Sequence, residues 1–299
     1  MNRFYLKIFS TLLLAGITLQ GCDVYTDTGY QKRYVVESYL VVDRPLPEVR
    51  LSHTVAADQS YSFESTTVSD ADLSVALLTK QGEVEERIMY SEDSVGVYVP
   101  DETHVVQPRR TYRLRAEIDA NHTVTATTTV PNSYRLTGNV PDSIQYQSPE
   151  QIVVTLTPDD PDTLSRQKQF VFNLISPEYR TAQPTPFYAD QLEDDESNRA
   201  DFRNNSSGLV NEGNFTVHPD GSIDIKLPWI GFAYYGPNRI VTNSIDENLY
   251  DFIRSQGVQT GGSTLSPGEI PNVIYNVEGG IGVFGSIASD TVQTYLLAR

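Results

Sequence analysis

Residues 111–118, TYRLRAEI, alternate between apolar and polar side chains, and this alternation decides the class of the fold. Tyr112, Leu114, Ala116 and Ile118 fall on one side of an extended chain, and the charged residues between them fall on the other. A period of two is typical of a β-strand that buries one face against a core and turns the other to water. The stretch therefore predicts a half-buried strand in a β-rich protein.

The same pattern recurs on both sides of this stretch. It is clear in EVRLSHTV at 48–55, and weaker at 34–42, 72–79, 85–90, 95–100 and 122–130. Seven short strands separated by turn residues over about 100 positions favour an antiparallel sandwich. We therefore predict a mostly β protein whose residues 34–131 form an immunoglobulin-like or fibronectin-like module that ends at Pro131.

Residues 132–299 predict a second, β-rich domain. Strands are expected at 151–158 and 169–176, a hairpin over 214–228 around a Pro-Asp-Gly turn, and two or three further strands over 272–297. The polar segment near 177–213 contains DQLEDDESNRAD, and we expect it to form a mobile acidic loop.

One amphipathic helix is predicted at about 244–256. Ser244 and Glu247 have the spacing of a capping box, in which each side chain bonds the backbone amide of the other residue. The residues that follow place an apolar face at helical spacing, and Gly257 is expected to end the helix. The members of that face are Ile245, Leu249, Phe252 and Ile253.

The single cysteine of the chain, Cys22, ends the run LLLAGITLQGC at 12–22. Basic residues precede an apolar stretch over 8–19, which is shorter than the ~20 residues that a membrane-spanning helix needs. Leu19, Gly21 and Cys22 resemble the lipobox of bacterial lipoproteins. We expect residues 1–21 to be a signal peptide, Cys22 to carry a covalent lipid anchor, and residues 22–33 to be a polar tether. Residues after Cys22 then contain no thiol for a disulfide or a metal site.

The charge of the chain limits its partners. Its 22 basic and 39 acidic residues give a formal net charge of −17. Such a surface repels phosphate, so nucleic acid is not an expected partner. Attachment to a membrane is expected through the lipid at Cys22 rather than through basic residues.

The sequence contains no motif that predicts catalysis, a metal or a cofactor. The four histidines are scattered, and no G-x-S-x-G elbow for a nucleophilic serine occurs. Asp220, Ser222 and Asp224 resemble part of a calcium loop, but a hairpin turn explains the same residues. We therefore expect no catalytic residues and no cofactor, and an enzymatic function is not supported.

The segment LPWIGFAYYGPNR, residues 227–239, contains the best candidates for binding. Trp229, Phe232, Tyr234 and Tyr235 could form a partner interface or a stacking platform for a small molecule. The same rings could instead fill the core or the seam between the two domains. The sequence leaves both interpretations open.

Three segments together resemble a family of Gram-negative envelope lipoproteins of the Bacteroidota type, domain-of-unknown-function 4249. The segments are YVVESYLVVDRPLPEVRLSHT, RRTYRLRAEIDANHTVTATTTVP, and the helix ENLYDFIRSQG followed by NVIYNVEGGIGVFGS. The residues that match most specifically are Asn276, Gly279, Gly282, Phe284 and Gly285. These glycines are expected to mark bends and a close approach of strands.

The resemblance implies a role, because members of this family are commonly encoded near TonB-dependent receptors. We expect a non-catalytic lipoprotein of the outer membrane, an accessory or binding component that works with such a receptor. Its periplasmic or cell-surface face stays open. The alternative is a stand-alone glycan- or peptide-binding surface lipoprotein that uses residues 227–239.

Overall fold

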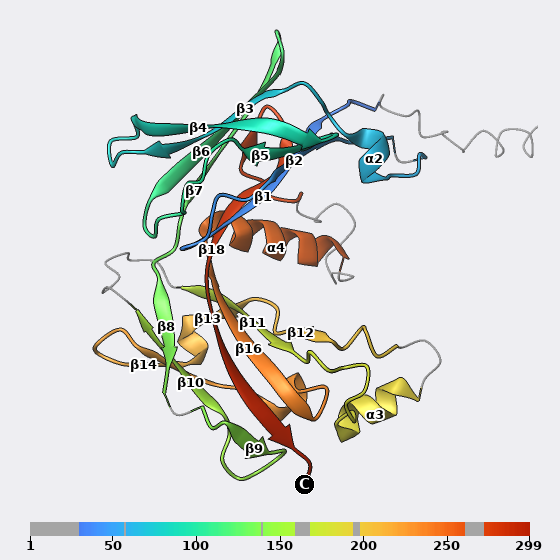
Figure 1. The fold of residues 1–299 in the computed structure, drawn as a ribbon. Helices are drawn as coiled ribbons and strands as arrows, with labels where there is room; N and C mark the ends of the chain where they lie inside the picture. The colour runs from blue at the N-terminus through green and yellow to red at the C-terminus, as the bar shows by residue number, and fades with distance from the viewer. Residues whose placement is uncertain (1–29, 57, 139, 159–167, 194–197, 261–271) are drawn as a thin grey trace, which may run out of the picture.

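The structure is a computed structural model that describes residues 30–56, 58–138, 140–158, 168–193, 198–260 and 272–299. It is mostly β, which confirms the predicted fold class. Figure 1 shows two β-rich lobes, with helix α4 between them and strand β18 running from one lobe into the other.

The described part of residues 34–131 contributes seven strands and one short helix to the N-terminal lobe. They are β1 (Tyr34–Val41), β2 (Val49–His53), α2 (Phe63–Thr66), β3 (Asp72–Leu78), β4 (Val84–Ser94), β5 (Val97–Pro100), β6 (Thr111–Asp119) and β7 (His122–Thr129). Each predicted segment coincides with one of these strands. In β6 the alternation is as expected, because Tyr112, Leu114 and Ala116 are fully buried while Arg115 and Glu117 are exposed.

The C-terminal lobe is a sandwich of two sheets. Its elements are β8 (Tyr134–Thr137), β9 (Ser143–Gln145), β10 (Val153–Pro158), β11 (Gln169–Ile175), α3 (Pro186–Leu192), β12 (Asn204–Ser206), β13 (Val210–Asn211), η1 (Glu212–Asn214), β14 (Thr216–Val217), β15 (Ile223–Lys226), η2 (Trp229–Gly231) and β16 (Gly236–Ile245). One sheet has the order β14-β15-β10-β8, and the predicted hairpin over 214–228 is its β14–β15 pair. The facing sheet contains β11, β16 and β18.

The last elements return to the N-terminal lobe before they enter the C-terminal one. Helix α4 covers Glu247–Thr260, and two strands follow, β17 (Val277–Glu278) and β18 (Ile281–Leu297). The first part of β18 pairs with β1 from Val35↔Ile281 to Val41↔Ile287, and the remainder pairs with β16 as far as Gly236↔Leu296. The chain first passes between the lobes near Pro131, but neither lobe is one continuous stretch of sequence.

The pairs among β1 to β7 are all antiparallel, as predicted for residues 34–131. The large sheet as a whole is mixed, because β18 adds parallel pairs to it. Its order is β12-β11-β16-β18-β1-β2-β5-β4-β3-β6-β7-β17. The pairs β1–β18 and β9–β18 are parallel. Parallel strands need a long connection between them, and here the connection between β1 and β18 is most of the chain. A reading of local patterns could not find such a pair.

The helix prediction was right about the apolar face and wrong about both ends. Ser244 lies within β16, so it is not a cap, and the chain continues as a helix through Gly257. The residue that caps α4 is Asp246, whose Oδ1 accepts a hydrogen bond from the Leu249 amide at 3.0 Å. Ile245 and Leu249 are buried with Val283 of β18, and Phe252 and Ile253 pack against them.

The polar segment near 177–213 is not a structureless loop. It contains α3 and the short strands β12 and β13, and Pro186 begins α3 at the position where proline is favoured. Tyr188 of α3 is buried beside Ala233 and Tyr234. Part of its acidic run, residues 194–196, lies outside the described residues.

None of the described helices is long and apolar enough to cross a bilayer. The main hydrophobic core is one contiguous cluster that extends through both lobes, from Val36 and Leu51 to Ile225 and Leu296. The two lobes therefore share a core as well as a strand.

Candidate functional site

Two of the four predicted binding aromatics belong to the core. Phe232 and Tyr234 have no exposed surface. The Tyr234 hydroxyl donates a hydrogen bond to the Arg199 carbonyl oxygen at 2.7 Å, and the Arg199 guanidinium lies over its ring. A ligand cannot reach these two rings in this structure, which corrects their assignment as binding residues. The apolar run around them favours burial over display.

Trp229 and Tyr235 are half-buried at the surface of the same segment. Both rings make edge-to-face contacts with the buried Tyr146, with ring centroids 5.7 Å apart in each pair. Their outer edges are the only part of the predicted aromatic platform among the described residues that a partner could touch. Trp229 is followed in the sequence by Ile230, which is 53% exposed.

The calcium-like residues Asp220, Ser222 and Asp224 form structural hydrogen bonds, and Cys22 is not among the described residues. Asp220 accepts hydrogen bonds from the amide and hydroxyl of Ser222, as a turn requires. Asp224 bonds Thr155 and His218, so these side chains do not converge on an ion. Within the described residues, no cluster of three or more histidine, cysteine or acidic side chains could hold a metal. Cys22 lies outside the described residues.

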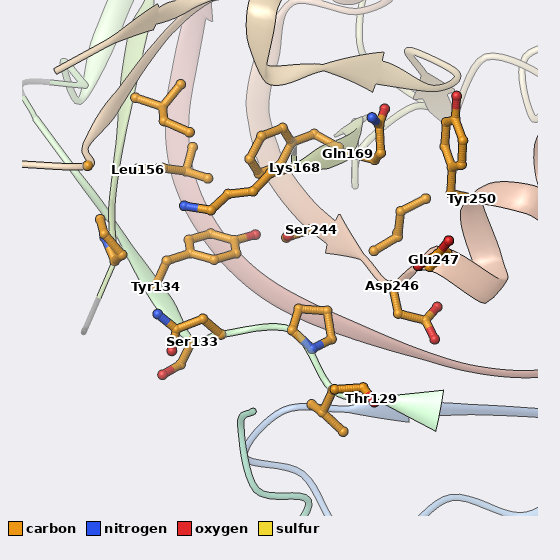
Figure 2. Close-up of a pocket in the computed structure, with 18 residues that line it drawn as sticks. Thr129, Ser133, Tyr134, Leu156, Lys168, Gln169, Ser244, Asp246, Glu247 and Tyr250 are labelled. Carbon is orange, nitrogen blue, oxygen red and sulfur yellow. The ribbon is translucent and has the colours of Figure 1, made fainter. Parts of the chain in front are cut away.

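A cavity that the sequence did not indicate lies where the two lobes meet. Its volume is about 340 Å³, within the usual range for sites that bind small molecules. Five segments of the chain line it: Thr129–Tyr134, Leu156 and Pro158, Lys168–Phe170, Gly221 and Ile223, and Ser244–Glu247 with Tyr250. We call it the junction pocket. Figure 2 shows its lining side chains.

The floor of the junction pocket is the end of the core of the C-terminal lobe. Leu156 and Ile223 come from one sheet and Phe170 from the facing sheet, and all three side chains are buried. Pro158, the last described residue of β10, and Gly221 in the β14–β15 turn border this floor. The described lining of this part of the pocket is therefore largely apolar.

Charged groups of opposite sign lie on two sides of this apolar floor. The Lys168 side chain extends along the side of Tyr134 and Leu156, while Asp246 and Glu247 lie at the start of α4 (Figure 2). Lys168 is half-buried, and its ammonium makes no hydrogen bond or ion pair with another residue that the structure describes.

Asp246 is engaged in the structure of the pocket wall. Its Oδ2 accepts hydrogen bonds from the Thr128 hydroxyl at 2.6 Å and from the Asn248 amide at 3.1 Å. Burial raises the pKa of this carboxyl, and its hydrogen bonds with Thr128, Leu249, Ser286 and Asn248 oppose that rise. The carboxyl thus joins the start of α4 to β7 and β18.

Tyr134 is also held by its neighbours. Its hydroxyl donates to the Thr242 carbonyl oxygen and lies 3.2 Å from that of Ala288, both in the facing sheet. Burial raises the pKa of this phenol far above its ordinary value. Because Tyr134 and Asp246 are committed to structural hydrogen bonds, the pocket is better suited to hold a ligand than to transfer protons.

The residues of the motif that resembles the family, from Asn276 to Gly285, have a structural role and do not line the junction pocket. A Cβ atom on Gly279 would lie 2.3 Å from the Thr123 carbonyl oxygen, and one on Gly282 would lie 2.1 Å from that of Val36. The Asn276 amide donates to the carbonyl oxygens of Thr127 and Phe284. The glycines therefore mark a close approach of strands, as the sequence predicts.

A family model described as "Domain of unknown function (DUF4249)" matches residues 23–293. No curated protein sequence matches the chain.

Several solved structures show a distant likeness. Trypsin-activated alpha-2-macroglobulin from Escherichia coli is 11% identical, with a TM-score of 0.22, and the match covers 73% of this chain and 14% of that chain. A tetra-tandem repeat from the extending region of a large adhesion protein is 9% identical, with a TM-score of 0.25 and coverage of 89% and 49%. The three N-terminal domains of the bacteriophage RB49 outer capsid protein Hoc are 9% identical, with a TM-score of 0.23 and coverage of 90% and 71%. The chain thus spans less than half the length of the first two.

Proposed function

Since the chain belongs to the DUF4249 family, whose description names no activity, we propose a function from the geometry of this chain itself. The protein is a non-catalytic, lipid-anchored binding protein of the outer membrane. It holds a small amphipathic ligand in the junction pocket, as an accessory or binding component beside a TonB-dependent receptor.

The observation that carries this proposal is the Lys168 ammonium, which pairs with none of the described residues and lies beside an apolar floor. Leu156, Phe170 and Ile223 offer a dry surface to an apolar body, and Lys168 offers a positive charge to an acidic group. A half-buried ammonium forms a stronger hydrogen bond with a carboxylate than with a neutral acceptor. The ligand class that fits is a carboxylic acid with an apolar body.

Binding of octanoate tests this proposal, with calorimetry of the purified protein as the measurement. Lys168→Met keeps most of the length and the apolar stem of the side chain but removes the charge. We expect it to weaken octanoate binding roughly 10- to 100-fold and to leave the binding of octanol unchanged.

The matched control is Lys226→Met. Lys226 is exposed on β15 and does not line the pocket, so this variant removes the same charge at a neighbouring place. Equal octanoate affinity for the wild type and Lys168→Met, or no binding by the wild type, contradicts the proposal.

Anchoring at Cys22 is supported by the lipobox resemblance of residues 12–22. We expect Cys22→Ala to move the protein from the membrane fraction to the soluble fraction of the cell. Mass spectrometry of the N-terminal peptide of the wild type should find a diacylglycerol thioether at residue 22. A free thiol there, or an intact leader, is the contrary result.

The receptor partner is supported by family resemblance alone. Affinity purification of the acylated protein in mild detergent should recover a TonB-dependent receptor, and Cys22→Ala serves as the control for co-extraction in the same micelle. Recovery of no outer-membrane receptor counts against this part of the proposal. Protease treatment of intact cells assigns the face of the membrane.

The stand-alone alternative now depends on Trp229 and Tyr235. The exposed neighbour Ile230 favours a contact surface at this place. If Trp229→Ala and Tyr235→Ala abolish binding of a glycan or peptide without a change in melting temperature, capture by this segment is supported. A lower melting temperature with unchanged binding assigns both rings to packing.

A further inference from the structure

The N-terminal lobe has a polar groove of about 710 Å³ that is distinct from the junction pocket. Its residues come from β3, β4, β6, β7 and the segment that contains β17. They are Ser74, Ala76, Val84, Arg87, Arg113, Arg115, Glu117, Thr125, Ala126, Thr127, Asn276 and Glu278. We call it the arginine groove. It shares no residue with the junction pocket.

The strand register builds this groove. Ala76 pairs with Arg87 on one side and with Arg113 on the other, and Ser74 pairs with Arg115. Neighbouring strands are about 4.8 Å apart, so the side chains of Arg87 and Arg113 leave the sheet roughly 10 Å apart, one on each side of Ala76. Ala76 and Ser74 are each 6% exposed although they lie opposite the core, because long side chains stand on both sides of them.

Two of the three guanidinium groups retain free donors. Arg87 is exposed and makes no hydrogen bond or ion pair with any residue in the described part of the chain. Arg113 donates from Nη2 to the Gly82 carbonyl oxygen at 3.0 Å, which leaves its other N–H groups. Arg115 is paired with Glu117, with Nη2 and Oε1 2.7 Å apart. Arg87 and Arg113 therefore face a common gap without a carboxylate partner among the described residues.

The charge of the groove is opposite in sign to that of the whole chain. Three arginines and two glutamates line it, whereas the chain has a formal net charge of −17. A planar guanidinium binds a carboxylate through two parallel hydrogen bonds. The nearby Glu117 and Glu278 disfavour a dianionic phosphate more than they disfavour a singly charged carboxylate. By this argument a carboxylate fits the groove better than a phosphate does.

The remaining lining favours a hydroxyl-rich ligand over a peptide. Thr125 and Thr127 present side chains beside the arginines, and Thr127 is exposed. The floor is the face of a sheet whose backbone groups are already paired, so an extended peptide cannot add to it as a strand. A sugar acid offers both the carboxylate for the arginines and hydroxyls for the threonines.

We propose that the arginine groove binds an oligosaccharide that carries carboxylate groups. The site is a second one, and it extends beyond the function assigned to the junction pocket. Arg87 and Arg113 bind the carboxylates, and the threonines bind the ring hydroxyls.

Calorimetry of the full chain with tetragalacturonate tests the proposal. Arg87→Gln and Arg113→Gln should each weaken binding roughly 10- to 100-fold, because each removes one charge-assisted pair. Lys80→Gln is the matched control, since Lys80 is exposed in the adjacent β3–β4 turn and does not line the groove. It should bind as the wild type does. Arg87→Gln and Lys80→Gln should keep the wild-type melting temperature, because both side chains are exposed.

Two comparison ligands separate this site from general attraction of anions. The proposal requires that tetraglutamate and inorganic phosphate bind at least tenfold more weakly than tetragalacturonate. It is overturned if the wild type does not bind tetragalacturonate, if Lys80→Gln loses as much affinity as Arg113→Gln, or if tetraglutamate or phosphate binds equally well. The junction pocket is tested separately with octanoate, so the absence of binding at one site does not affect the conclusion about the other.

Discussion

Gly282 is a residue at which β18 approaches β1 closely. Its φ of 108° lies in a region that side chains rarely adopt, and a Cβ atom there would meet the Val36 carbonyl oxygen. Asn276 bonds Phe284 in both directions, since the Phe284 amide donates to Asn276 Oδ1 and the Asn276 amide donates back. Gly282 thus permits the close approach of β18 to β1, and Asn276 fixes the backbone of β18 at Phe284.

Gly282→Ala should destabilise the protein by at least about 3 kcal/mol, because backbone strain and a clash with a carbonyl oxygen add. Equilibrium unfolding in urea measures the change.

Gly257→Ala is the matched control for Gly282→Ala. Gly257 lies in α4 at an ordinary helical φ, and a methyl group added there would find no atom within 4 Å. We expect this variant to stabilise the protein by roughly 0.5–1 kcal/mol. Loss of stability on the same scale in both variants would contradict the role given to Gly282.

Asp246 should give the protein a distinctive pH dependence. Because burial raises its pKa above the unfolded value, the native state takes up the proton first as pH falls, and this stabilises it. The free energy of unfolding of the wild type should therefore rise relative to Asp246→Asn as pH falls through the raised pKa, and level off below about pH 4. Urea titrations of both proteins between about pH 8 and pH 4 measure this difference. If the free energy of unfolding of the wild type instead falls relative to that of Asp246→Asn as pH falls, the pKa of Asp246 is lowered in the native state.

At the scale of elements, α4 shows how a local signal can be correct in type and wrong in position. The S-x-x-E pattern at Ser244 and Glu247 predicts a cap, but β16 extends to Ile245 because it pairs with β18 as far as Ile287. That pairing is between segments distant in the sequence, so it cannot be read from the capping pattern. The acid two residues after Ser244 then caps the helix.

Replacement of Asp246 should therefore lower the free energy of unfolding more than replacement of Ser244. Asp246→Ala should cost about 1–2 kcal/mol, because it frees the Leu249 amide and leaves the buried Thr128 hydroxyl with one partner fewer. Ser244→Ala should change stability by less than about 0.5 kcal/mol. Urea unfolding of the two variants compares them, and equal losses would favour the capping box that the sequence predicts.

The strands were predictable because each buries alternate residues against a core, and that pattern is local. The sites were not. The junction pocket takes lining residues from five separate segments, and the arginine groove appears only when β3 is paired with both β4 and β6. The aromatic segment 227–239 failed as a predictor because an apolar ring in a sequence does not show whether it faces inward. Phe232 and Tyr234 face inward, and Trp229 and Tyr235 are partly buried.

At the scale of the whole molecule, β18 prevents a division of the chain into two independent halves. Its first part supplies the neighbour of β1, and β17 supplies the neighbour of β7, so residues 34–131 lack the strands at both ends of their sheet. A hydrophobic cluster that includes Phe284 closes the same lobe.

Residues 30–131 alone should therefore fail to fold. A chimeric chain in which a flexible linker joins residue 131 to residues 272–288 should recover a cooperative thermal transition, because it restores both missing partners. Circular dichroism during heating distinguishes the two. A cooperative transition in residues 30–131 alone would mean that the lobe is independent of β18.

The parallel pair of β1 and β18 also has a consequence for biosynthesis. About 240 residues separate Val41 from Ile281, so the first strand stays without its parallel neighbour until almost the whole chain has reached the compartment in which it folds. Throughout that interval β1 has an apolar, unpaired edge that can pair with other unfolded chains. A chaperone of that compartment that shields β1 until β18 arrives would suppress aggregation, and a chain that ends before Ile281 could not complete its first lobe.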